Sequence, residues 1–505
     1  MANTVSPMLE VLTYALTLVG GYLVCVCVYS FCKQRHEQAH ALTPPSGNQQ
    51  FFFANKQLQG MWLAASFAAC WFGATSTKGS LDAYYHEGLS GAWKIALPSL
   101  FSLLLLRLWI AKRVFHQPDV TLPQAIERAY GQWGRGVLSL SLLTQGMATL
   151  AAQLLAVYGV LMATFGSTVA SVGITLMMLA VSTYCMWGGF ATVALTDGWQ
   201  LMLMLGCFAG LLGWLGWAYW HDATPFLHFW QHQGDSYTQV LQGWHEHWAT
   251  TLTVAIAWAL APEMWQRMKA TSTEKTALQA VHWGWVALAL LYGGVACIGL
   301  LAGGVIGVSP PAGGASDVLS RLALTAPHPL LGALLVVAFL TAVTSTMDSV
   351  LHCASLTFSH DVVHRFIWPK ATPDQVLRVA KLSLWLLPLP ALAIALQAPS
   401  LFSVIWFAAD VYACTATVPL IVVLATAHPH RLAGQVAFGV GCAGATLIAW
   451  VHYAKLPCFG LPTEAPYALG TMLASAVAYA GVASLVPRRG STTSQTQIPT
   501  QETSA

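Results

Sequence analysis

Residues 339–361 read FLTAVTSTMDSVLHCASLTFSHD, an apolar stretch with a polar centre. Five polar residues fall almost consecutively at what should be the middle of a helix: Thr344, Ser345, Thr346, Asp348 and Ser349. Four positions at i, i+3, i+4 and i+7 would form one narrow stripe on that helix: Ala342, Ser345, Thr346 and Ser349. A stripe of hydroxyls inside so apolar a segment indicates a partner that needs oxygen ligands.

The composition of the whole chain places this segment in a membrane. Hydrophobic residues make up 56% of the 505, only 8% are charged, and apolar runs of about 20 residues recur from end to end. Each run is long enough to cross the ~30 Å hydrocarbon core of a bilayer. The net charge of +3 is too small to suggest a nucleic-acid partner. We therefore expect an all-α polytopic protein whose surroundings are the lipid bilayer.

The apolar runs predict thirteen membrane spans. They cover residues 8–32, 60–80, 91–112, 136–165, 168–188, 191–219, 247–268, 283–307, 329–356, 375–397, 400–427, 432–452 and 466–486.

The distribution of Lys and Arg predicts how these spans are oriented. No Lys or Arg precedes the first span, and Lys33 and Arg35 follow it. This span therefore lacks the basic start of a cleaved signal peptide and should insert with its N-terminus outside. Most other basic residues, Arg267 among them, then fall on the cytoplasmic side, while the 220–246 loop has neither Lys nor Arg. An odd number of spans puts the C-terminus in the cytoplasm, and we expect the plasma membrane as the location.

Two of the predicted spans are interrupted. FGATSTKG at 72–79 places two glycines and several hydroxyls inside the second span, and Pro262 falls within the seventh. Non-helical backbone at membrane depth is tolerated only where it lines a cavity or is buried in protein. Two interrupted spans in corresponding positions of two halves therefore indicate the central site of a transporter. The alternative is that Gly73 and Gly79 only allow close helix packing and Pro262 only kinks its helix.

Six short motifs along the chain resemble the sodium:solute symporter family. They are QQFFFANKQLQG at 49–60, FGATSTKG at 72–79, TLPQAIERAYG at 121–131, ALTDGWQ at 194–200, APEMWQR at 261–267 and TSTMDS at 344–349. The resemblance covers most of the chain and implies a leucine-transporter-type fold, in which ten core helices form two five-helix repeats of inverted topology.

This resemblance, together with the spans, predicts the organisation of the chain. The expected parts are the first span and a cytoplasmic loop (1–59), the first five-helix repeat (60–219), an extracytoplasmic loop (220–246), the second repeat (247–427), two peripheral spans (428–487) and a disordered cytoplasmic tail (488–505).

The polar stripe and the first break together predict a cation site. Hydroxyl oxygens and freed carbonyls form a neutral oxygen cage, which suits a hard monovalent cation. The family resemblance implies a Na⁺ site at this place, with these ligands: the carbonyls of Ala69, Phe72 and Ala342 and the hydroxyls of Ser345 and Thr346. The alternative is that the hydroxyls bond to carbonyls of their own helix.

Acidic residues predict a candidate second cation site. Ionisable residues inside spans are costly and are functional candidates by default. Some members of the resembled family use the position of Asp197 with hydroxyls of the ninth span for a second Na⁺, and Asp348 and Ser349 occupy the corresponding places. A structural hydrogen bond is the alternative role for Asp348. Two carboxylates that share one proton would make the second cation H⁺.

The substrate is expected at the midplane, beside the first break. The candidate contacts are Gly73, Ala74, Thr75 and Ser76 in the second span, Trp258 and Glu263 in the seventh, and Trp406 and Asp410 in the eleventh. Lys78 either meets an anionic group of the substrate or pairs with Asp82 one turn away. The sequence leaves amino acids, amines, carboxylates and sugars open, with a slight preference for a zwitterion or amine.

These features predict a small-molecule transporter. We expect cation-coupled symport of a small polar organic solute by alternating access, with Na⁺ or H⁺ as coupling ion and no organic cofactor. An enzyme is not expected, because the outer-loop histidines lack the H-E-x-x-H pattern of a zinc enzyme. The alternative function is a membrane ligand sensor that acts through a separate signalling partner. The oligomeric state does not follow from the sequence.

Overall fold

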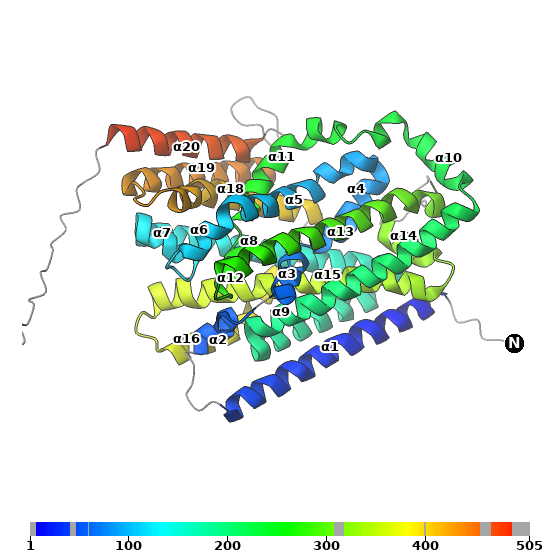
Figure 1. The fold of residues 1–505 in the computed structure, drawn as a ribbon, viewed down its shortest axis with the longest axis horizontal. Helices are drawn as coiled ribbons and strands as arrows, with labels where there is room; N and C mark the ends of the chain where they lie inside the picture. The colour runs from blue at the N-terminus through cyan, green and yellow to red at the C-terminus, as the bar shows by residue number, and fades with distance from the viewer. Residues whose placement is uncertain are drawn as a thin grey trace, which may run out of the picture.

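The computed structural model describes residues 7–40, 47–58, 60–307, 318–397, 400–454 and 466–486, and its regular elements in these ranges are helices (Figure 1). The all-helical prediction is confirmed. The predicted tail at 488–505 lies outside the described residues.

The elements follow one another along the chain as a series of long helices interrupted by short ones. The first half contains α1 (Pro7–His40), α2 (Gly47–Phe53), η1 (Ala54–Lys56), α3 (Gly60–Ala69), η2 (Thr75–Gly79), α4 (Ser80–Glu87), η3 (Gly88–Trp93), α5 (Ala96–Leu105), η4 (Leu106–Ile110), α6 (Ala111–His116), α7 (Leu122–Tyr130), α8 (Gln132–Phe165) and α9 (Ser167–His221). The second half contains α10 (Thr224–Gln233), η5 (Asp235–Thr238), α11 (Gln242–Ala259), α12 (Pro262–Lys269), α13 (Glu274–Ile306), α14 (Val318–Thr325), α15 (Pro329–Leu356), η6 (Thr357–Ile367), α16 (Pro373–Leu386), α17 (Pro388–Ala395), α18 (Leu401–Ala425), α19 (Arg431–Ala454) and α20 (Tyr467–Leu485).

Helix α15 lies at the centre of the bundle and carries the polar stretch 344–349 (Figure 1). Every residue from Leu335 to Leu356 is buried. The helix packs against α1, α8 and α9, and α3 packs against both α9 and α13. The outer helices α19 and α20 pack against each other and against α18, at one edge of the molecule in Figure 1.

The two predicted breaks are present in the backbone. Helix α3 ends at Ala69, and a regular helical path resumes only at η2, which begins at Thr75. Helix α11 ends at Ala259, and α12 begins at Pro262. Proline is well suited to this position, because the first turn of a helix leaves its N–H groups without partners anyway.

The boundary predicted between the fifth and sixth spans falls inside one long helix. Within α9, Gly189 has φ 57° and ψ −164°, a conformation outside the helical region. A Cβ at this position would lie 2.8 Å from the carbonyl oxygen of Phe51. The kink therefore needs glycine both for its positive φ and for the close approach of the first-loop backbone.

Ten helical segments in the described residues are long and apolar enough to cross a membrane. This number does not confirm thirteen spans, which remains a prediction. Three predicted spans account for the difference. The fifth and sixth predicted spans form the single helix α9, and the second and third share the segment Thr75–His116. The seventh predicted span is divided between α11 and α12 and is not counted.

A cluster of ion pairs connects α7 and α8 to η6, the continuation of α15. Arg135 lies 2.6 Å from Glu127 and 2.7 Å from Asp361, and Arg365 lies 2.5 Å from Glu127. The hydroxyl of Thr121, which also caps α7, donates to Asp361 at 2.9 Å. Two carboxylates and two guanidinium groups thus hold the short helix α7 against the second half of the chain.

Candidate functional site

The backbone at the first break leaves its helical path directly beside α15. After Ala69, the chain forms tight turns in which the Trp71 and Phe72 amides donate to carbonyls three residues earlier, at 3.2 and 3.1 Å. Because the regular four-residue ladder stops here, the carbonyl oxygen of Cys70 is available to other partners, and the carbonyl oxygen of Ala69, which accepts from the Phe72 amide, keeps its second lone pair.

Those carbonyls meet the polar stripe of α15. The Ser345 hydroxyl lies 3.0 Å from the carbonyl oxygen of Ala69 and 2.8 Å from that of Ala342. The Thr346 hydroxyl lies 3.2 Å from the carbonyl oxygen of Cys70 and 3.4 Å from that of Ala342. Two hydroxyl and three carbonyl oxygens, all from buried residues, therefore converge between α15 and the break. Neutral oxygens gathered in this way are the ligands that a hard cation takes.

The Phe72 carbonyl, expected as a ligand, accepts no hydrogen bond from Ser345 or Thr346 in the described residues and stays a prediction. Phe72 is fully buried, and its ring packs edge-on against Tyr292 at 5.3 Å. The hydrogen bonds at the cluster involve the Cys70 carbonyl instead, which the sequence did not single out. The Ser345 and Thr346 hydroxyls also contact the Ala342 carbonyl of their own helix, so the two alternatives stated for them are compatible.

Gly73 brings the break into contact with Thr346. A Cβ on Gly73 would lie only 2.5 Å from the Thr346 hydroxyl oxygen and 2.9 Å from the side-chain oxygen of Gln153. The same Gln153 oxygen accepts a hydrogen bond of 2.8 Å from the Ala74 amide. The absence of a side chain at Gly73 thus permits the close contact among the break, α8 and α15.

A fully buried arginine lies at the candidate second cation site. The Arg267 guanidinium contacts a carboxylate oxygen of Asp197 at 3.0 Å and the Ser349 hydroxyl at 2.8 Å. Its Nε donates to the hydroxyl and the carbonyl of Ser66, at 2.9 and 3.0 Å. The ring of Phe190 lies 5.6 Å from the guanidinium carbon. The sequence predicts Arg267 among the cytoplasmic basic residues but does not reveal its burial among helices α3, α9 and α15.

Asp348 is held mainly by hydroxyl groups. The Tyr184 hydroxyl donates to one carboxylate oxygen at 2.7 Å, and the Ser349 hydroxyl lies 3.3 Å from the other. The Oδ1 atom of Asp197 is buried and has no hydrogen-bond partner among the described residues. The structure thus brings Asp197, Asp348 and Ser349 together, with two carboxylates around one guanidinium.

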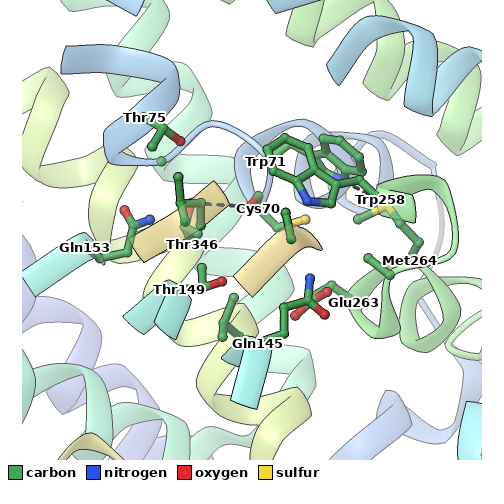
Figure 2. Close-up of a pocket in the computed structure, with 15 residues that line it drawn as sticks. Cys70, Trp71, Thr75, Gln145, Thr149, Gln153, Trp258, Glu263, Met264 and Thr346 are labelled. Atoms are coloured by element: carbon green, nitrogen blue, oxygen red, sulfur yellow. Dashed lines mark hydrogen bonds between the residues drawn. The ribbon is translucent and has the colours of Figure 1, made fainter. Parts of the chain in front are cut away.

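A cavity with an empty volume of about 640 Å³, its mouth included, lies between the two breaks. Its walls come from both breaks and from helices α8, α15 and α18: Cys70, Trp71, Gly73, Thr75, Gln145, Thr149, Gln153, Trp258, Ala261, Glu263, Met264, Thr346, Val350, Ile405 and Ala409. Figure 2 shows Trp71 and Trp258 on one side of the cavity and Gln153 with Thr75 on the other. Thr346 belongs to both the cavity wall and the oxygen cluster.

The cavity brings together half of the expected substrate contacts: Gly73, Thr75, Trp258 and Glu263. Ala74 and Ser76 do not line it, and the Ser76 hydroxyl instead lies 2.8 Å from the Tyr292 hydroxyl. Trp406 stacks on Trp258, with ring centroids 6.1 Å apart and an interplanar angle of 16°, but does not line the cavity. Asp410 is not a lining residue.

Lys78 forms a salt bridge of 2.8 Å with Asp82, one turn along the same helix. Of the two roles considered for this lysine, the structure therefore shows the pairing with Asp82.

Three polar lining residues of α8 are missing from the sequence-based list: Gln145, Thr149 and Gln153. They are spaced four residues apart, and residues with this spacing lie on one helix face. That regular spacing within an apolar span is the signal that could have identified them.

Comparisons with known proteins identify the family and the fold of the chain. The family model for the sodium:solute symporter family matches residues 51–444. A solved Na⁺-coupled sialic acid symporter in a substrate-bound outward-open state is similar, with a TM-score of 0.76, 16% identity, and coverage of 94% of this chain and 98% of that one. A nucleobase-cation-symport-1 family transporter in a closed conformation aligns with a TM-score of 0.50 and 13% identity, over 89% of this chain and 98% of that one. A search of curated protein sequences finds no significant match.

At such low identities, the structural similarities establish the fold, while the family model covers most of the chain. The multi-pass membrane character and the leucine-transporter-type fold predicted from the sequence are thereby confirmed. The chain belongs to the sodium:solute symporter family.

Proposed function

We propose that this protein is a secondary active transporter that couples Na⁺ entry to the symport of a small polar organic solute by alternating access. The observation that carries the proposal is the oxygen cluster between α15 and the first break, beside a cavity whose walls come from both breaks. Family membership supports Na⁺ as the coupling ion.

The proposed Na⁺ site takes its ligands from Ala69, Cys70, Ala342, Ser345 and Thr346, with Phe72 as the further candidate from the sequence. The five oxygens come from residues distant in sequence, so a bound Na⁺ would connect the first break to α15. Thr346 also lines the cavity. Cation binding and solute binding would therefore favour the same arrangement of the break, which is the physical basis of coupling.

The candidate second site at Asp197, Asp348 and Ser349 remains part of the proposal. Arg267 balances only one of the two buried carboxylates. Burying an unpaired charge is costly, so a second cation, Na⁺ or H⁺, is the expected means of balancing the other.

The proposed setting is the plasma membrane, with the N-terminus and the 220–246 segment outside and the C-terminus in the cytoplasm. The distribution of Lys and Arg supports this orientation. Single cysteines at Gly234 and Ser491 should then react with an impermeant thiol reagent from opposite faces. Labelling of both from the same face would contradict the orientation.

The Na⁺ site can be tested before the substrate is known. Purified protein should gain thermal stability in NaCl relative to KCl, in a saturable way, because a ligand that binds the folded state stabilises it by mass action. Ser345→Ala and Thr346→Ala should shift this response to higher Na⁺ concentrations. An identical response to NaCl and KCl would contradict the proposed site.

Transport itself is tested in proteoliposomes. Solutes that add to the Na⁺-dependent stabilisation are supplied to vesicles with an inward Na⁺ gradient. The expected result is accumulation against the solute gradient that stops when the Na⁺ gradient is removed. Ligand binding without accumulation would favour a sensor instead.

A further inference from the structure

Glu263 is the one carboxylate in the wall of the cavity, and no Lys, Arg or His of the described residues lines it. The residue lies in the first turn of α12, directly after Pro262 at the second break. The N-terminal end of a helix favours a negative charge, so this position supports the ionised carboxylate.

The nearest candidate counter-charge is engaged elsewhere. Arg267, one turn further along α12, directs its Nε and one terminal nitrogen at Ser66, Asp197 and Ser349. Its other terminal nitrogen donates to the backbone carbonyl of Glu263, at 3.3 Å, and not to the carboxylate. No salt bridge to the Glu263 side chain is present in the described part of the chain.

Aromatic rings line the same end of the cavity. Trp71 and Trp258 pack edge to face with ring centroids 5.5 Å apart, and the Trp71 indole N–H lies 3.0 Å from the Met264 sulfur. Because this indole nitrogen is engaged by sulfur, Trp71 offers the cavity mainly its apolar and π surfaces. Indole faces attract ammonium and guanidinium groups.

The opposite end of the cavity has a different character. Gln153, Thr75 and Thr346 supply amide and hydroxyl groups without a formal charge, next to the proposed Na⁺ site. The cavity therefore offers one carboxylate and two indole rings together with neutral polar groups, and Figure 2 shows the amide of Gln145 beside Glu263.

From this arrangement we infer that the transported solute is an organic cation, with an ammonium or guanidinium group bound between the Glu263 carboxylate and the indoles of Trp71 and Trp258. The inference rests on the proposed transport function and specifies its substrate class. An anionic solute would place like charges together. An uncharged sugar could donate hydrogen bonds to the carboxylate but would not balance its charge, which a cationic group does.

The test uses the full-length purified protein in NaCl with three cations, choline, tyramine and agmatine, as probes. The uncharged choline isostere 3,3-dimethyl-1-butanol, glucose and the anion succinate serve as comparisons. Binding is measured by thermal shift and by quenching of tryptophan fluorescence. At least one cation should bind, and 3,3-dimethyl-1-butanol should bind at least tenfold more weakly than choline if choline is that cation.

Variants then test whether the Glu263 carboxylate binds the cationic group. Glu263→Gln should weaken binding of the cation at least tenfold, Glu263→Asp should retain more of it, and Glu246→Gln, the same change in a carboxylate outside the cavity, should have no effect. Failure of all three cations to bind, preferential binding of succinate or glucose, or unchanged affinity in Glu263→Gln would overturn the inference. Saturable stabilisation by NaCl that survives in Glu263→Gln would show that Na⁺ binding stands even if the substrate class is wrong.

Discussion

The guanidinium of Arg267 lies 3.0 Å from the carboxylate of Asp197, and neither side chain is exposed. The pair joins α12, which follows the second break, to the long helix α9, and Ser66 at the end of α3 contacts both residues. This buried charge pair, together with Ser66, therefore connects α9 to the helices that border the two breaks.

The first prediction concerns this pair. Arg267→Met should destabilise the protein by ~3–5 kcal/mol, because removing one partner leaves the other charge buried and uncompensated. Asp197→Asn in the same background should recover part of the loss. The measurement is the thermal unfolding of the purified protein in detergent. Arg113→Met, a change at an exposed arginine, is the control and should have little effect. Equal melting temperatures for Arg267→Met and Arg113→Met would contradict the prediction.

The second prediction separates cation ligands from ordinary hydroxyls of α15. Thr346→Ala should raise the Na⁺ concentration for half-maximal stabilisation or uptake, since a lost and uncompensated ligand costs on the order of 1–3 kcal/mol. Thr346→Ser, which keeps the hydroxyl, should behave much more like the wild type.

The matched control for the second prediction is Thr341→Ala. Thr341 is also buried on α15, but its hydroxyl bonds only to the carbonyls of Val337 and Ala338 in its own helix. Its removal should leave the Na⁺ response unchanged. If both alanine variants alter the response equally, the polar stripe serves helix packing and not cation binding.

The third prediction uses the close contact at Gly73. Gly73→Ala would place a methyl group 2.5 Å from the Thr346 hydroxyl oxygen, so the break or α15 must shift. We expect a weaker Na⁺ response and loss of uptake while the protein still folds. Gly159→Ala on α8, where an added methyl meets nothing within 4 Å, should be neutral. Wild-type uptake by Gly73→Ala would show that the packing there is looser than the structure indicates.

The fourth prediction is a pH dependence at α7. Burial alone would raise the pKa of Glu127, but hydrogen bonds from Arg365 and Arg135 outweigh it and hold the pKa below its ordinary value. A lowered pKa in the folded state means that this carboxylate stabilises the protein above its unfolded pKa, about 4.5, and that the stabilisation is lost as the pH falls through the folded value.

Glu127→Gln should therefore lower the melting temperature at pH 7, and its difference from the wild type should shrink as the pH falls below about 4.5. Asp374→Asn, at an exposed position of α16, serves as the control for general effects of a lost carboxylate. A difference between Glu127→Gln and the wild type that does not change with pH would exclude an ionic role for Glu127.

The features that the sequence predicted well are those with strong local signals. Pro262 interrupts an apolar run, and proline disturbs a helix whatever surrounds it. Of the stretch 72–79, only the first residues lie in the break, because η2 begins at Thr75 and Gly79 is helical. The boundary predicted near residue 190 likewise coincides with the kink at Gly189. These residues fix where the backbone departs from the helix, and hence where free carbonyls can lie.

The features that the sequence did not reveal depend on tertiary contacts. A basic residue after a short span is ordinarily assigned to a loop, and only the packing of α12 against α3 and α15 shows that Arg267 is buried. Gln145 and Gln153 recur at helical spacing in the sequence, but only the tertiary packing places this face of α8 in the cavity wall. Conversely, Ser76 is polar and adjacent to the break, but the direction of its helix turns it toward Tyr292.

The last prediction concerns Asp348, which either belongs to a second cation site or only accepts a structural hydrogen bond. Its carboxylate accepts from the Tyr184 hydroxyl at 2.7 Å, and Arg267 forms its salt bridge with Asp197. If Asp348 holds a second Na⁺ or a proton, Asp348→Asn should reduce the steepness of the Na⁺ dependence of uptake or its sensitivity to pH. Tyr184→Phe removes the hydrogen bond but keeps the charge, so it should leave both largely intact. If instead Asp348 only accepts a structural hydrogen bond, both variants should lower the melting temperature and neither should change the steepness or the pH response. Measuring uptake against Na⁺ concentration at two pH values, together with thermal unfolding, therefore distinguishes a second coupling ion from a purely structural carboxylate.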